Sequence, residues 1–145
     1  MPHAAIGVDV ITGFPGETEA HFAETQQFLV DLPVSYLHVF SYSERPNTTA
    51  IRRIDVVEPE ERLRRTNKLR LLSEKKKRAF CLEHQGTTRK VLWEVTEDGV
   101  TGGYTDNYIR VESSDAATTN QIDEVVLEHL NGDNIFDKVK IAISV

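Results

Sequence analysis

The sequence is poor in cysteine, and this limits the chemistry that the chain can support. Cys81 is the only cysteine among 145 residues, so an internal disulfide is excluded. A single cysteine suits a reducing compartment, and we expect a cytoplasmic location. The five histidines are scattered, and none pairs with another at the spacing of a structural zinc site. The sequence therefore predicts no metal centre.

Long apolar runs and nucleotide-binding glycine motifs are also missing. No stretch approaches the roughly 20 apolar residues that a membrane-spanning helix needs. Met1 is followed by Pro2 and His3 rather than by the basic and apolar segments of a signal peptide. Neither G-x-G-x-x-G nor a glycine loop ending in Lys-Ser or Lys-Thr occurs. What is there, 39% hydrophobic and 28% charged residues, suits one globular domain or two small ones.

The net charge of −6 conceals three regions of different sign. Residues 1–59 carry 3 Lys or Arg against 8 Asp or Glu, residues 60–90 carry 11 against 4, and residues 91–145 carry 3 against 11. A basic segment between two acidic ones suits contact with a polyanion, because Lys and Arg release counterions from phosphates. The pattern also fits a solvated helix face, and charge alone favours that simpler interpretation.

Residues 1–57 are predicted to form a strand, a helix and a second strand. The run from Ile6 to Ile11 is nearly all apolar, as in a parallel strand covered on both faces. The second strand covers Val34–Tyr42, in which we expect His38 to lie in the core. Such a βαβ unit has open sheet edges and an uncovered face. We therefore expect residue 1 to be an internal position of a larger protein, and the open edges to promote self-association.

The helix between these strands is expected to begin after Thr18, a good N-cap residue, and to stop at Pro33. Its apolar positions recur at helical spacing and predict one buried stripe. The members of this stripe are Phe22, Thr25, Phe28, Leu29 and Leu32.

A second helix is predicted from Pro59 to about His84, because proline favours a first helical position and Gly86 is a natural stop. Its apolar residues are sparse, so we expect it to lie on the surface with a basic outer face. Residues 87–145 change to short β runs, with turns expected at Asp98-Gly99, Gly102-Gly103 and Asn131-Gly132. Four or five short antiparallel strands predict a small OB-like barrel, with Trp93 packed inside.

The stretch "DVITGFPGET" leaves two interpretations equally open. Glycines between a strand and a helix let backbone N–H groups approach a polar ligand. Asp9, in an otherwise apolar strand, would then face such a ligand inside a barrel. Alternatively, Gly13 to Gly16 form only a tight turn, and the backbone satisfies Asp9.

Three stretches carry a family resemblance: "GVDVITGFPGETEAHFAET", "SYLHVFSYSERPNTTA" and "NYIRVE". Over nearly the whole chain they resemble the C-terminal part of the radical S-adenosylmethionine tRNA methylthiotransferases, most of all the branch that modifies threonylcarbamoyladenosine. The sequence departs from the family at "RPNTTA", where the family has Arg-Pro-Gly-Thr-Pro-Ala. Asn47 is nevertheless able to take the left-handed conformation of the missing glycine.

The resemblance implies an α/β part followed by an all-β part. Residues 1–57 would be the C-terminal piece of a radical S-adenosylmethionine partial (β/α) barrel, residues 58–86 a basic linker helix, and residues 87–145 a TRAM domain, which is a small OB-like antiparallel barrel. The family also carries 4Fe-4S clusters held by cysteines at C-x-x-x-C-x-x-C spacing. Cys81 matches no such ligand, so we expect no cluster and no catalytic residue in this chain.

The resemblance further implies two groups of site residues. The S-adenosylmethionine site would be lined by Asp9, Gly13, Phe14, Pro15, Gly16, Glu17, Val39, Phe40 and Ser41. Contact with tRNA is expected from Arg45, Arg62, Arg65, Lys75, Lys76, Lys77, Arg78, Arg89, Lys90 and Tyr108, where Tyr104 and Tyr108 have rings suited to base stacking.

The expected function is that of a fragment of a tRNA-modifying enzyme. The parent reaction would be the 2-methylthiolation of N6-threonylcarbamoyladenosine in tRNA, to which this chain would contribute part of the S-adenosylmethionine site and the tRNA-binding module. The chain alone is predicted to be inactive, because the cluster-binding cysteines are missing. The alternative is a stand-alone, non-enzymatic RNA-binding module.

Overall fold

The computed structural model describes residues 1, 3–114 and 119–137, which form two compact units. One unit comprises Ile6–Lys77 and is called here the βαβ unit. The other comprises Met1–Ala5 and the chain from Arg78 onward, and is called the β-rich unit. The coarse prediction of an α/β part followed by a β part is confirmed.

The βαβ unit contains a two-stranded parallel sheet, β1 (Gly7–Thr12) and β2 (Tyr36–Ser41), joined through helix α1 (Glu19–Asp31). The predicted cap is confirmed, since the backbone N–H of His21 donates to Thr18 Oγ1 at 3.2 Å. A short 3-10 helix η1 (Ala50–Arg52) follows, before helix α2 (Pro59–His84) begins at the expected proline. Asn47 has a φ of 65°, the left-handed conformation anticipated for it.

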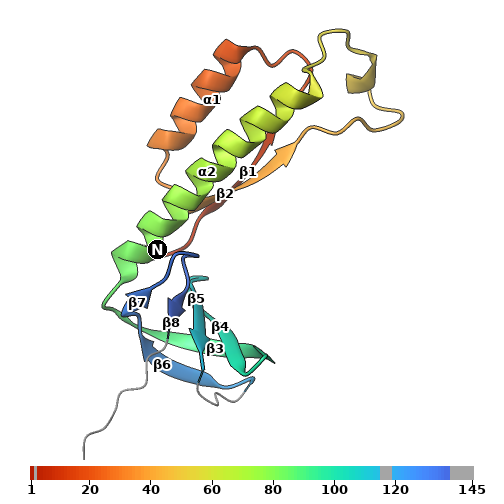
Figure 1. Ribbon diagram of the computed structural model, residues 1–145. Coiled ribbons are helices and arrows are strands. Elements are labelled where there is room, and N and C mark those ends of the chain that lie inside the picture. The colour runs from red at the N-terminus through yellow and green to blue at the C-terminus, as the bar shows by residue number, and fades with distance from the viewer. Residues whose placement is uncertain (2, 115–118, 138–145) are drawn as a thin grey trace, which may run out of the picture. The chain divides into compact units, whose positions relative to one another are not determined.

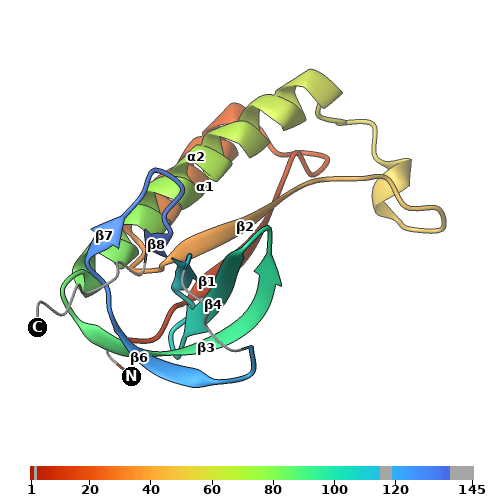
Figure 2. The same cartoon turned by 60° about the horizontal axis from the view of Figure 1, so that its bottom comes forward.

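Both helices cover the same face of this sheet (Figures 1 and 2). The core between them is built from Phe22, Leu29, Leu37, Val39 and Leu69. Hydrogen bonds fix α2 to the strands, because Ser73 Oγ accepts from the N–H of Leu37 and donates to its carbonyl, both at 2.8 Å. The hydroxyl groups of Thr12 and Thr66 are also 2.8 Å apart.

Three expectations about burial in this unit are wrong, and the two that concern strand residues share one physical reason. Phe28 is 62% exposed rather than part of the buried stripe, and His38 is exposed rather than a core residue. Asp9 is exposed as well, so β1 is not covered on both faces. Two strands and two helices bury only one side of the sheet, and the side chains that alternate onto the other side remain accessible.

The β-rich unit is a curled six-stranded sheet in the order β6-β3-β4-β5-β8-β7 (Figure 2). Its strands are β3 (Thr88–Glu97), β4 (Val100–Thr105), β5 (Arg110–Ser113), β6 (Ile122–Val126), β7 (His129–Leu130) and β8 (Phe136–Asp137). Neighbours are antiparallel except for β5 and β8, which are parallel. The run at residues 134–143 was expected to form one strand, and its residues 138–143 lie outside the described residues.

The core of the β-rich unit confirms that Trp93 is an interior residue, with no exposed surface. It packs with Cys81, from the end of α2, and with apolar side chains of the sheet. These are Val91, Ile109, Val111, Val125, Leu127 and Phe136. Cys81 therefore serves packing in this unit.

Gly102 and Gly103 were expected to form a turn, but they lie inside β4. Both permit close approaches that a side chain would block. A Cβ on Gly102 would collide with the guanidinium of Arg110, and one on Gly103 would collide with the carbonyl of Leu92 and the ring of Trp93. The glycine pair reflects crowding on a strand rather than a change of direction.

Candidate functional site

Backbone N–H groups of the turn between β1 and α1 already donate hydrogen bonds within the protein. The N–H of Gly13 donates to Glu17 Oε2 at 2.6 Å, that of Gly16 to the carbonyl of Asp55 at 2.8 Å, and that of Glu17 to the carbonyl of Phe14 at 2.9 Å. Gly13 has a φ of 77°, and a Cβ there would meet the Arg62 side chain. This geometry favours the tight-turn interpretation, because these amides are already satisfied.

Two arginines of α2, Arg62 and Arg65, contact this turn. The sequence predicted that both lie on the exposed basic face of the helix. That placement is wrong, since Arg62 is 6% and Arg65 4% exposed. Arg65 Nη1 donates to both the carbonyl and Oε2 of Glu17, at 2.8 and 2.7 Å, while its Nε donates to Glu61. A buried guanidinium needs such partners, because an unpaired buried charge is costly.

The acidic partners are held in their charged forms by these arginines. Hydrogen bonds from Arg64 and Arg65 lower the pKa of Glu61 to about 2. A hydrogen bond from Arg62, whose Nη2 lies 2.7 Å from Glu44 Oε1, lowers the pKa of Glu44. This network of arginines and carboxylates, called here the brace, therefore stays charged and stabilises the turn.

The uncovered face of β1 and β2 is the part of the βαβ unit that remains open. Ile11 is 58%, Phe40 53% and Phe14 48% exposed. Asp9 and Ser41 are also exposed, whereas the side chain of Val39 is buried in the helix-covered core and Pro15 is buried in the turn. Some of the predicted cofactor residues are therefore exposed apolar side chains, and others are buried in the core or in the turn.

The two cofactors of the family, S-adenosylmethionine and an iron–sulfur cluster, differ in how well they fit this chain. The exposed apolar side chains of the sheet face suit contact with an uncharged part of S-adenosylmethionine, although the turn amides are engaged elsewhere. An iron–sulfur cluster does not fit, because the Cys81 thiol is 2% exposed and donates to the carbonyl of Asn134 at 3.8 Å. In the described part of the chain, His, Cys, Asp and Glu side chains form no cluster of three suited to a metal ion.

The predicted tRNA-binding cations come from both units and differ in exposure and in their hydrogen bonds. Lys75 and Lys90 are exposed, and Arg45 is exposed in the loop after β2. Lys76 instead donates to the carbonyls of Val30 and Leu32 at the end of α1, at 3.1 and 2.8 Å. Such contacts neutralise the negative end of a helix dipole.

The remaining predicted cations are partly engaged. Arg78 donates to the carbonyl of Asn131 at 3.0 Å, and Arg89 Nη1 lies 3.4 Å from Asp106 Oδ1. Lys77 is partly buried. Lys68 is exposed seven residues before Lys75, hence on the same side of α2, and the sequence reasoning overlooked it.

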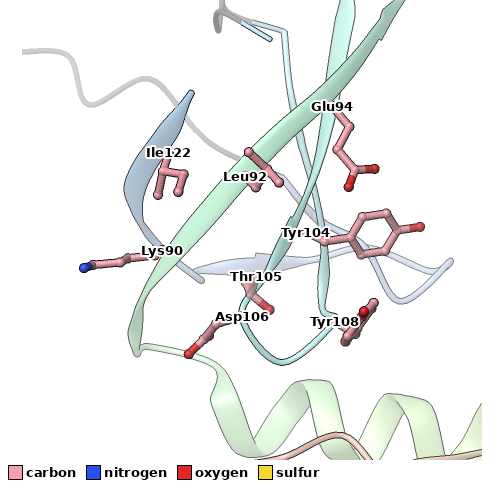
Figure 3. Close-up of a pocket in the computed structure, with 8 residues that line it drawn as sticks. All are labelled: Lys90, Leu92, Glu94, Tyr104, Thr105, Asp106, Tyr108 and Ile122. Carbon is pink, nitrogen blue, oxygen red and sulfur yellow. The ribbon is translucent and has the colours of Figure 1, made fainter. Parts of the chain in front are cut away.

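A pocket lies on the outer face of the β-rich unit (Figure 3). Its cavity volume is about 400 Å³, and its lining residues are Lys90, Leu92, Glu94, Tyr104, Thr105, Asp106, Tyr108 and Ile122. Lys90 and Tyr108 were predicted as RNA-binding residues and lie in this one pocket. Leu92, Glu94 and Ile122 were missed, although apolar residues on the exposed face of an alternating strand are a usable signal.

Comparison with curated proteins gives a consistent family. The chain is 36% identical over 116 residues to the threonylcarbamoyladenosine tRNA methylthiotransferase of Bacillus subtilis, which covers 77% of this chain and 26% of that protein. It is 37% identical over 111 residues to the enzyme of the same description from Aquifex aeolicus, with the same coverage. It is 41% identical over 90 residues to the tRNA-2-methylthio-N(6)-dimethylallyladenosine synthase of Koribacter versatilis, covering 62% of this chain and 20% of that protein.

No family model matches the chain. The chain spans about a quarter of the length of the first two of these relatives, 26% of each. Neither helix of the described residues has the length and apolar character needed to cross a membrane. On the pairwise similarities, about three quarters of the chain is similar to the C-terminal part of the tRNA methylthiotransferases.

Proposed function

We propose that the chain is a fragment of a tRNA-modifying methylthiotransferase that acts on N6-threonylcarbamoyladenosine in the cytoplasm. The observation that carries the proposal is its similarity, at 36% and 37% identity, to two enzymes described as acting on that nucleoside. In this role the β-rich unit is the TRAM-like, tRNA-contacting module. The βαβ unit is part of the radical S-adenosylmethionine barrel.

The βαβ unit would contribute one wall of the cofactor site. The exposed side chains of Ile11, Phe14 and Phe40 would pack against S-adenosylmethionine, while Arg62 and Arg65 keep the turn beneath them rigid. When bound in the whole family enzyme, this cofactor together with a 4Fe-4S cluster supplies radical chemistry. Cys81 is buried and is the single cysteine of the sequence, so the cluster ligands would belong to sequence outside these 145 residues.

Contact with tRNA is proposed for the exposed cations Arg45, Lys75 and Lys90, with Lys68 added from the structure. Each phosphate contact releases counterions and steepens the salt dependence of binding. A stand-alone RNA-binding module remains the second candidate, favoured by the lone cysteine. It shares the RNA contact and differs in lacking catalysis.

The test is tRNA binding by the 145-residue chain, measured by gel shift over a salt series. We expect measurable affinity with a steep salt slope. Lys75→Glu is expected to weaken binding and to reduce the slope by about one. Arg52→Glu makes the same charge change at an exposed residue that is not among the proposed cations, and should alter binding less. A chain that binds no tRNA at low salt would contradict both the enzyme-fragment proposal and the RNA-module alternative.

A further inference from the structure

We propose that the pocket of Figure 3 binds one unpaired nucleobase that carries an exocyclic amino group. This inference rests on the proposed contact with RNA and gives that contact a defined position and a base preference. It depends on three properties of the pocket, which are a row of exposed apolar side chains, a projecting tyrosine and a pair of carboxylates.

The first property is a continuous row across neighbouring strands. In the sheet register Ile122 of β6 lies beside Leu92 of β3, and Leu92 lies beside Tyr104 of β4. Their exposed fractions are 64%, 42% and 36%. The outward face of an antiparallel sheet is normally polar, so three adjacent apolar side chains indicate a surface that is covered in use.

The row continues onto β5, where Tyr104 is paired with Arg110. The guanidinium carbon of Arg110 lies 5.1 Å from the centre of the Tyr104 ring. An arginine over an aromatic ring adds a positive charge to a surface on which bases stack. A phosphate next to the bound base would be attracted to this charge.

The second property is the position of Tyr108. Its φ is 62°, a left-handed conformation that is unusual for an aromatic residue, and its side chain leaves the residue 77% exposed. Two hydrogen bonds close the turn around it, from the N–H of Tyr108 to the carbonyl of Thr105 at 3.1 Å and from the N–H of Ile109 to Thr105 Oγ1 at 2.9 Å. A strained, exposed aromatic residue held by a closed turn points to a functional role.

The two tyrosine rings form an angle rather than a parallel clamp. Their centres are 6.4 Å apart and their planes differ by 52°, and Figure 3 shows both on the same side of the pocket. A base that stacks on one ring therefore meets the other at its edge. Edge-to-face contact is a favourable arrangement for aromatic groups.

The third property is charge. Glu94 and Asp106 place two carboxylates around the pocket, and Lys90 is the one lining residue with an ammonium group. Arg89 Nη1 lies 3.4 Å from Asp106 Oδ1, so Glu94 is the main acceptor of the pocket. Glu94 lies next to Tyr104 in Figure 3. Carboxylates repel a phosphate but accept hydrogen bonds from an amino group, as they do from cytosine N4. The pocket is thus suited to the base rather than to the backbone, and a volume of about 400 Å³ is in the range of small-ligand sites.

The test compares two RNA hexanucleotides, oligo(C) and oligo(U), whose bases differ chiefly by the amino group and the carbonyl at C4. Binding to the 145-residue chain is measured by fluorescence anisotropy, and the methyl signals of Leu92 and Ile122 are followed by NMR. We expect oligo(C) to bind about tenfold more tightly, because hydrogen bonds to charged groups are the stronger ones. We also expect ring-current shifts at both methyl-bearing residues.

Variants separate the contributions. Tyr104→Leu keeps an apolar side chain, and Tyr108→Asn suits the left-handed backbone; each should weaken oligo(C) binding about tenfold by removing a stacking surface. Glu94→Gln should reduce the preference for oligo(C) over oligo(U). The control is Phe28→Leu, which removes a 62% exposed ring from helix α1 of the βαβ unit and should leave binding unchanged.

Two outcomes would overturn the inference in distinguishable ways. If tRNA binds with a steep salt slope but the hexanucleotides bind equally and the tyrosine variants bind normally, the nucleobase pocket is wrong while the proposed function stands. If no RNA binds at any salt concentration, the proposed function fails and the pocket proposal fails with it.

Discussion

The two uncovered sheet faces of this chain both carry apolar side chains, but they differ in what surrounds them. The open face of β1 and β2 belongs to a sheet of only two strands, and exposes Ile11 and Phe40 by more than half. The outer face of β3, β4 and β6 belongs to a six-stranded sheet that covers its own core. The side chains of the two-stranded sheet are exposed because few elements are present to cover that face. Those of the six-stranded sheet are exposed although the sheet already has a buried core on its other face.

The comparison teaches how exposed hydrophobic residues are to be interpreted. On the two-strand sheet, residues spread along both strands are exposed by alternation alone. On the six-strand sheet, the apolar residues form one row beside charged neighbours. A local row with polar groups around it indicates a ligand site, while an entire open face indicates that further strands or another copy would cover it.

The largest expected effects test whether the two units are separate. Phe22 and Phe136 are each at most 1% exposed, in different cores. We expect Phe22→Ala to destabilise the βαβ unit by about 3–5 kcal/mol, and Phe136→Ala to do the same in the β-rich unit. Fluorescence of the single tryptophan, Trp93, reports the β-rich unit, and circular dichroism reports the helices. Equal shifts of both signals in both variants would show one cooperative unit instead of two.

A smaller effect tests the brace beneath the turn. The Arg65 side chain is 5% exposed and that of its neighbour Arg64 is 46% exposed, yet both bind Glu61. Arg65→Met leaves Glu17 without its buried partner and should cost about 3–5 kcal/mol at most. Arg64→Met should cost much less, because exposed ion pairs contribute little. Urea unfolding gives both values, and similar losses would mean that Arg65 is not the main support.

The smallest effect on stability is expected for substitutions on the open face of β1 and β2, which should instead change the self-association of the chain. The double variant Ile11→Thr/Phe40→Thr retains β-forming residues but makes the open face polar. We expect it to self-associate less than the unaltered chain, as measured by sedimentation velocity at several concentrations. The matched variant Leu92→Thr/Ile122→Thr should leave association unchanged. If the second variant dissociates the chain and the first does not, the two faces have been interpreted in reverse.

The sequence predicted the order of elements because local signals are strong here. Thr18 and Pro59 mark the starts of the two helices, and the parallel pairing of the first two strands followed from the helix between them. The interior position of Trp93 was also anticipated. Each of these conclusions needs only the residue and its near neighbours.

The errors arise where distant segments decide the outcome. Arg62 and Arg65 look like surface residues in a basic helix, but partners distant in sequence, Glu17 for Arg65 and Glu44 for Arg62, help to make their burial possible. The row formed by Ile122, Leu92 and Tyr104 depends on strand register, which no single stretch reveals. The sequence therefore predicted some pocket residues, such as Lys90 and Tyr108, but did not predict that they line the same pocket.

Gly102 lies where the side chain of Arg110 rests on the sheet, and neither residue can change alone without consequence. A methyl group at position 102 would lift the guanidinium away from the Tyr104 ring, and a shorter residue at position 110 would leave the glycine's space empty. The two positions should accordingly vary together among natural sequences of this family. Gly102, which the sequence placed in a turn, is therefore expected to form a co-varying pair with Arg110.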